Sequence, residues 1–65
     1  MKTKFNKEIY NKKAIKGAMK AYEEVADLDM TENDNYFEVD FKKIKPKFKD
    51  IIKDEFSNYA LILMQ

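Results

Sequence analysis

Residues 27–41 read DLDMTENDNYFEVDF, and this stretch decides the fold. Apolar residues alternate with acidic or polar residues on both sides of Asn33-Asp34-Asn35, which is the pattern of two half-buried strands. Asn and Asp accept the positive φ angles of tight hairpin turns. The stretch therefore predicts an antiparallel hairpin that has one apolar face and one acidic face.

The position of the turn decides which side chains oppose one another across this hairpin. A two-residue turn at Asn33-Asp34 would pair Met30 with Phe37. A turn at Asp34-Asn35 would keep the same two faces, whereas a three-residue loop would set apolar residues opposite polar ones unless a bulge corrected it. Either two-residue turn opposes like charges, which is unfavourable. The acidic residues of the outward face are Asp27, Asp29, Glu38 and Asp40.

A basic strand should lie beside this acidic face, and the N-terminal residues can supply it. Thr3 and Phe5 fall on one parity, while Lys2 and Lys4 fall on the other. We expect a first strand over residues 2–6, antiparallel to the second strand of the hairpin. Its two lysines would then compensate the opposed acids.

An amphipathic helix is predicted between this strand and the hairpin, over residues 11–25. Asn11 is a favourable N-cap, and the apolar residues after it recur at i, i+3, i+4 and i+7. These residues are Ile15, Ala18, Met19, Tyr22 and Val25. A second set at helical spacing contains only small residues, namely Ala14, Gly17, Ala18 and Ala21. This set is either an exposed flank or a smooth ridge that lets another helix approach closely.

The C-terminal part predicts a second helix over residues 46–63. Pro46 suits the first turn of a helix, and a wide apolar stripe follows it. The stripe comprises Phe48, Ile51, Ile52, Phe56, Tyr59 and Leu63. The last turn, residues 60–64, is apolar on every side, which is more than one sheet face can cover. A terminal strand over residues 59–64 therefore competes with the end of the helix.

Together these elements predict one small α+β domain over residues 1–65. The order is β-α-β-β-α, with a three-stranded antiparallel-type sheet. Since only one sheet face is apolar, both helices should pack on that face.

The composition removes most catalytic chemistry. The chain has no His and no Cys, and Ser57 is its only serine, so no nucleophile has a recognisable base beside it. The spacing of the hairpin acids fits no familiar metal-binding loop, and a solvated sheet face explains them. We therefore predict a protein that is not an enzyme and that needs neither a cofactor nor a metal ion.

Charge and hydropathy limit the kinds of partner that the protein can have. The net charge is +1, and the order along the chain is basic, acidic, basic. No apolar run approaches the roughly 20 residues of a membrane span, and residues 1–10 lack the apolar core of a signal peptide. We therefore expect a cytoplasmic protein that does not engage a membrane.

Binding to another macromolecule is the function class that remains. A chain of this length buries only about 60% of the surface that it exposes when unfolded, so an apolar tail larger than the core can cover marks an interface. We predict a protein-interaction or adaptor module that binds a protein or peptide and forms a homodimer or larger homo-oligomer through its C-terminal helix. The contact residues of this prediction are Tyr59, Leu61, Ile62, Leu63 and Met64.

Two alternatives use other surfaces. The first is a nucleic-acid-binding module, or a contact with an acidic partner, through the basic segment that follows the hairpin. Its residues are Lys42, Lys43, Lys45, Lys47 and Lys49. The second is capture of an extended peptide at an edge strand of the sheet.

A run of matching positions extends over nearly the whole chain. It comprises Phe5, Ile9-Tyr10, Ala14-Ile15 and Ala18, then the acidic hairpin, then Phe56-Ser57-Asn58-Tyr59-Ala60-Leu61. In these positions the chain resembles the HxsD-like proteins, which are associated with His-Xaa-Ser peptide-maturation loci where radical-SAM enzymes modify ribosomal peptides. The resemblance implies an accessory or adaptor role that holds a peptide or an enzyme, and it carries over no catalytic residue.

Overall fold

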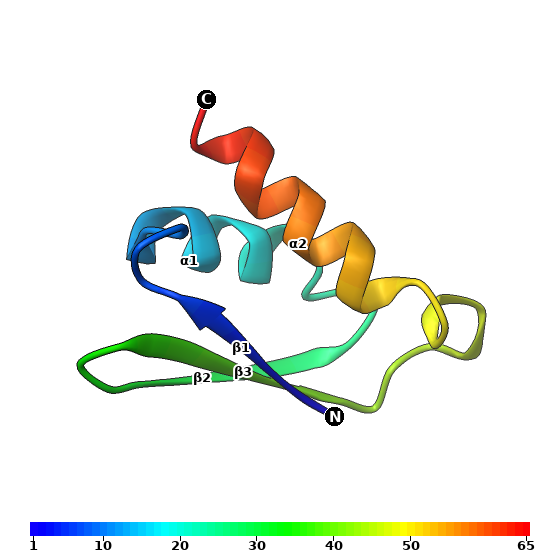
Figure 1. The fold of residues 1–65 in the computed structure, drawn as a ribbon. Helices are drawn as coiled ribbons and strands as arrows, with labels where there is room; N and C mark the ends of the chain where they lie inside the picture. Colours follow the sequence, from blue (N-terminus) through cyan, green and yellow to red (C-terminus); the bar gives the residue numbers. More distant parts are fainter.

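A computed structural model describes all residues from Met1 to Gln65. The elements are β1 (Lys2–Asn6), α1 (Lys12–Ala21), β2 (Asp27–Glu32), β3 (Tyr36–Lys42), a short 3₁₀ helix η1 (Pro46–Phe48) and α2 (Ile52–Leu63). The three strands form one antiparallel sheet in the order β1-β3-β2, and both helices lie on the same side of it (Figure 1). The predicted β-α-β-β-α fold is confirmed.

The hairpin turn lies at Asp34-Asn35, which confirms the second of the two turns that the sequence allowed. The register expected from a turn at Asn33-Asp34 is wrong by two residues. Met30 faces Val39, and Asp27 faces Lys42. The reason is Asn33, whose side-chain oxygen accepts hydrogen bonds from the backbone N–H groups of Asn35 and Tyr36 at 2.8 and 2.9 Å. Asn33 N–H also donates to the carbonyl of Tyr36. Asn33 is therefore the last paired residue of its strand rather than the first residue of the turn.

Helix α1 begins where the sequence predicts and ends four residues early. The side-chain oxygen of Asn11 accepts from Ala14 N–H at 2.7 Å, which is the expected N-cap. At the other end, the N–H groups of Val25 and Ala26 both donate to the carbonyl of Tyr22. This turn redirects the chain into β2, so residues 22–25 pack beside the helix without continuing it.

The predicted second helix is divided into two pieces. Pro46 starts η1, and a turn separates η1 from α2 at Ile52. The end of the chain stays helical through Leu63, so the strand expected as an alternative over residues 59–64 is wrong. Neither helix has the combination of length and apolar content that a membrane crossing requires.

The core lies between the sheet and the two helices, and Phe56 of α2 is at its centre. The Phe56 ring lies 5.2 Å from that of Phe41, 5.5 Å from that of Phe5 and 5.9 Å from that of Tyr22, measured between centroids. Only 12 of the 65 residues are buried. Burial of a large side chain contributes about 1.5–3 kcal/mol, so the stability of the domain depends on few residues.

Candidate functional site

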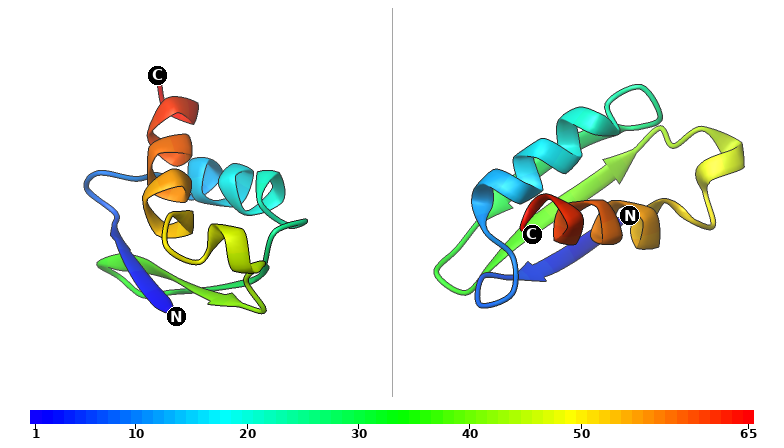
Figure 2. Two further views of the ribbon diagram at one scale, coloured as in Figure 1. Left: turned by 90° about the vertical axis from the view of Figure 1, so that its right-hand side faces the viewer. Right: turned by 90° about the horizontal axis from the view of Figure 1, so that it is seen from above.

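Consecutive large apolar residues are exposed at the end of α2, which we call the α2 tip and define as Leu61, Ile62, Leu63 and Met64. Leu61, Ile62 and Leu63 are 39, 60 and 44% exposed. Residues 56–65 contain no charged side chain. The end of α2, red in Figures 1 and 2, projects away from the sheet and beyond α1. The tip is therefore both apolar and accessible.

One side of the α2 tip is already in contact with α1. A Cβ atom added at Gly17 would lie 2.8 Å from Cδ1 of Leu63, so Leu63 occupies the space that a side chain at position 17 would need. The small ridge predicted on the first helix thus allows a close approach of α2 itself. Of the predicted contact residues, Leu63, Tyr59 and Met64 pack partly against the fold, whereas Leu61 and Ile62 lie among the exposed residues.

Tyr59 contacts Tyr22 in an edge-to-face arrangement, with ring centroids 5.9 Å apart. Burial raises the pKa of Tyr22, and the nearby Glu55 and Tyr59 raise it further. A phenol is already neutral at physiological pH with its ordinary pKa of 10.0, and the shift of Tyr22 is away from ionisation. Tyr22 therefore adds no charge beside the α2 tip.

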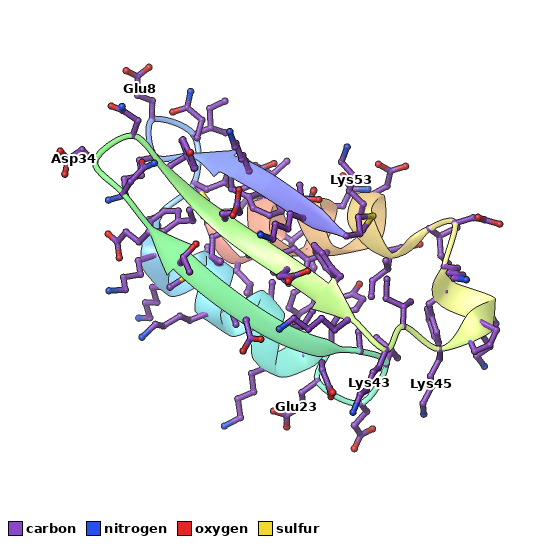
Figure 3. All side chains as sticks on the ribbon, turned by 90° about the horizontal axis from the view of Figure 1, so that it is seen from below. Glu8, Glu23, Asp34, Lys43, Lys45 and Lys53 are labelled. Carbon is purple, nitrogen blue, oxygen red and sulfur yellow. The ribbon has the colours of Figure 1, made fainter.

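The basic segment of residues 42–49 is divided between two environments. Nζ of Lys42 donates to Asp29 Oδ2 at 2.8 Å, and Nζ of Lys43 lies 3.8 Å from Asp27 Oδ2. The three lysines that follow, Lys45, Lys47 and Lys49, are exposed in and around η1. In Figure 3, Lys45 lies toward the protruding connection that contains η1. Only this second group has no ion-pair partner within the domain.

Lysines other than the predicted ones compensate the acidic sheet face. Lys2 and Lys4 face Asp40 and Glu38 in the strand register, as expected. The ammonium of Lys4 instead lies 4.7 Å from the centroid of the Tyr36 ring. The ion pairs come from Lys42, Lys43 and the N-terminal ammonium, which lies 3.5 Å from Asp40 Oδ1.

The pKa of Lys42 is raised, mainly by its hydrogen bond to Asp29. The negative charges of Asp29, Asp40 and Asp27 raise this pKa further. Three of the four outward acids, Asp27, Asp29 and Asp40, therefore belong to a network of ion pairs, and Glu38 lies outside it. No three acidic side chains gather in a group that could hold a metal ion. The arrangement is that of a charge-balanced sheet surface.

The two edges of the sheet differ in what lies beside them. Alternate residues of an edge strand direct their backbone groups away from the sheet. Since Asn33 is hydrogen-bonded to Tyr36, the outward residues of β2 are Leu28, Met30 and Glu32. On β1 the corresponding residues are Lys2, Lys4 and Asn6, because Met1 is hydrogen-bonded to Phe41.

A groove runs along the β2 edge, between this strand and α1. Its volume is about 1100 Å³. It is lined by Lys16, Met19, Lys20, Glu23, Ala26, Asp27, Leu28, Asp29, Met30, Lys42 and Lys43. Figure 3 shows α1 alongside β2, with Glu23 and Lys43 at the same end of the strand.

Sequence reasoning expected an edge strand that could receive a peptide, but it did not find this groove. The signal that could have indicated it lies on α1, where Lys16 and Lys20 flank Met19 at one side of the helical stripe. Whether these residues face solvent or a strand depends on how far α1 leans over β2. That inclination is set by the packing of α1 against α2.

No protein-family model, no curated protein and no solved structure matches the chain.

Proposed function

We propose that this domain is a non-catalytic protein-interaction module that self-associates through the α2 tip. The observation that carries the proposal is the exposure of three consecutive large apolar residues, Leu61, Ile62 and Leu63. Exposed apolar surface of this kind, on a domain with so small a core, marks a contact with another protein. Covering it would add apolar burial that the folded monomer lacks.

The absence of charge favours a second copy of the same chain as the occupant. A two-fold symmetric contact places the same surface patch of each copy against the other, so a charged patch would repel itself. Residues 56–65 carry no charged side chain, and the phenol of Tyr22, which lies beside Tyr59, has a pKa raised above its ordinary value of 10.0. The α2 tip is thus complementary to itself.

The size of the tip limits the affinity. A stable interface buries about 800 Å² per partner, and the whole domain exposes 4655 Å². One helix end contributes only a part of such an area. We therefore expect a weak dimer, which forms at tens to hundreds of micromolar protein.

Sedimentation equilibrium over this concentration range tests the proposal. The wild-type protein should show a monomer–dimer equilibrium, and Ile62→Lys should remain monomeric because it places a charge in the contact. Thr31→Lys is the matched control, since it adds the same charge to the outward sheet face opposite Glu38. A strictly monomeric wild type at several hundred micromolar, or equal association of Ile62→Lys, would refute self-association through the α2 tip.

The alternative of nucleic-acid binding has weaker support. Lys42 and Lys43 are joined to Asp29 and Asp27, which leaves Lys45, Lys47 and Lys49 to contact phosphates. Binding by these three residues would weaken steeply with salt. An absence of binding to a single-stranded or duplex oligonucleotide at low salt would remove this alternative.

The resemblance to HxsD-like proteins stays a prediction about the biological setting. Under it, the module would serve as an accessory protein of a ribosomal-peptide maturation system. Both the adaptor role and self-association fit such a setting, because an accessory protein acts by bringing partners together. Co-purification with a radical-SAM enzyme encoded by a neighbouring gene would test it.

A further inference from the structure

We propose that the groove between α1 and the free edge of β2 binds an extended peptide with acidic side chains as a fourth strand of the sheet. This site is separate from the α2 tip, and neither proposal depends on the other. The proposal combines free backbone groups, an apolar groove wall and two unpaired lysines.

The backbone of β2 is able to pair with another strand. The outward N–H and C=O groups of Leu28 and Met30 form no backbone hydrogen bond with any segment outside the sheet. An added strand satisfies such groups with main-chain hydrogen bonds, and pockets for its alternate side chains supply specificity. A strand rises about 3.4 Å per residue, so some five to seven residues would follow the length of β2.

The groove offers apolar contacts to every second residue of the added strand. Leu28 and Met30 are only half-buried, although they lie on the helix-covered side of the sheet. Met19 lines the opposite wall from α1, and Ala26 closes one end. A peptide side chain that points toward α1 would therefore cover apolar surface that the domain leaves accessible.

The charges of the groove select the peptide. Lys16 and Lys20 line it from α1, and neither lies within ion-pair distance of an acidic side chain. On the opposite face of the sheet, a peptide residue would instead lie beside Asp27 or Asp29. Positions that point toward α1 should therefore be apolar or acidic, and the intervening positions should be uncharged or basic.

The same charges argue against a second copy of the chain as the occupant. Antiparallel pairing of β2 with β2 of another copy would bring both α1 helices to one cleft. Lys16 and Lys20 of each copy would then lie near those of the other, and Glu23, the one acid of the groove without an ion-pair partner, could compensate only one lysine per copy. A peptide that carries Glu or Asp relieves this charge, whereas a copy of the domain doubles it.

A synthetic peptide pair tests the charge preference. The first peptide is capped at both ends. It has Thr at every second position, and the positions between the Thr residues are Leu, Glu and Glu in that order. The control peptide replaces both Glu residues by Lys. We expect saturable NMR shifts of the Leu28 and Met30 amides with the Glu peptide, together with at least tenfold slower amide exchange at these two positions. The Lys peptide should bind at least tenfold more weakly. Reversal of the groove charge in Lys16→Glu/Lys20→Glu should exchange the two affinities.

Proline substitution tests strand addition itself. Met30→Pro removes an outward N–H and no hydrogen bond of the sheet, so it should abolish binding of the Glu peptide, whereas Met30→Val should retain it. Lys4→Pro is the matched control, because it removes an outward N–H at the β1 edge and should leave binding unchanged. Circular dichroism would confirm that each variant is folded.

Three results would overturn the proposal. These are equal binding of both peptides, shifts along β1 rather than β2, and protection of the β2 amides in concentrated protein without peptide. The charge-reversal variant alters only exposed side chains, so it decides the matter even if a proline variant fails to fold. Repeating the titration with Ile62→Lys separates the result from self-association through the α2 tip.

Discussion

The β1 edge and the β2 edge expose the same kind of backbone groups, yet only one of them adjoins a groove. On β1, Phe5 is 2% exposed and contacts Tyr10 and Phe56, at ring distances of 5.1 and 5.5 Å. On β2, Leu28 and Met30 lie on the same helix-covered face of the sheet as Phe5, but they stay half-buried. Figure 2 shows that both helices cover the same face of the sheet, with α2 crossing over β1, and Figure 3 shows α1 alongside β2.

The helices explain this difference. Helix α2 brings the large Phe56 against Phe5 and Phe41 of the sheet, while α1 approaches the end of α2 closely at Gly17. Because Gly17 lets Leu63 approach, α1 is drawn toward α2 and leaves part of β2 uncovered. Side-chain packing, rather than backbone hydrogen bonding, thus decides which edge of a small sheet remains receptive.

Alanine substitution should produce the largest contrast between the two edges. Phe5→Ala should cost about 3–5 kcal/mol of unfolding free energy, as Phe-to-Ala changes in cores do. A domain of this size has a total stability of about 3–10 kcal/mol, so much of the variant should be unfolded. Leu28→Ala should cost less, because Leu28 is already partly exposed. Urea denaturation followed by circular dichroism measures both, and equal losses would show that the β2 edge is as closed as the β1 edge.

Proline at adjacent positions of β2 should give a smaller contrast. Thr31 faces Glu38 at a hydrogen-bonded position of the hairpin, so Thr31→Pro removes a hydrogen bond of the sheet and should cost about 1–3 kcal/mol. Met30→Pro removes only an outward N–H and should cost less than Thr31→Pro. Thermal unfolding of the two variants tests whether β2 is a true edge. If Met30→Pro were the more damaging substitution, the outward direction of its N–H would be wrong.

Acid should slightly weaken the contacts at the end of β2, where Glu32 meets Lys7 and Lys12. Glu32 accepts a hydrogen bond from Lys7 and pairs with Lys12 at 3.1 Å, and these contacts lower the pKa of its carboxyl from the ordinary 4.5. A lowered folded-state pKa contributes stability above pH 4.5 that is lost as the pH falls through the folded value. Glu32 is exposed, so the effect should be small and should fade with added salt. Melting temperatures from pH 7 to 3 should therefore decrease less in Glu32→Gln than in the wild type.

Local patterns predicted most of the fold. The alternation of residues 27–41 indicated both strands and their faces, and Asn11 marked the start of α1, because these signals depend only on near neighbours. The sequence left two hairpin registers open, and the turn at Asp34-Asn35 rather than the one at Asn33-Asp34 is confirmed, because the side chain of Asn33 caps the turn from the residue after β2. The end of α1 was missed because Val25 fits the helical stripe, although it belongs to the turn that follows the helix. The carbonyl of Val25 accepts a hydrogen bond from Lys45 N–H.

The candidate site was only partly predictable. An apolar C-terminal end was evident from the sequence, but its division into residues that face α1 and residues that face solvent required the position of Gly17. The groove depends on the inclination of two helices that are distant in sequence. No periodicity within a single element contains that information.

The central position of β3 has a consequence for the order in which the domain folds. β3 is the last strand along the chain, and both other strands pair with it rather than with each other. No part of the sheet can therefore form before residues 36–42 are available. The β2–β3 hairpin closes a short loop, whereas β1 must reach β3 across all of α1 and β2, and the entropy cost of loop closure grows with length. The hairpin is thus the natural nucleus, and docking of β1 is the later event that commits the chain to its native topology.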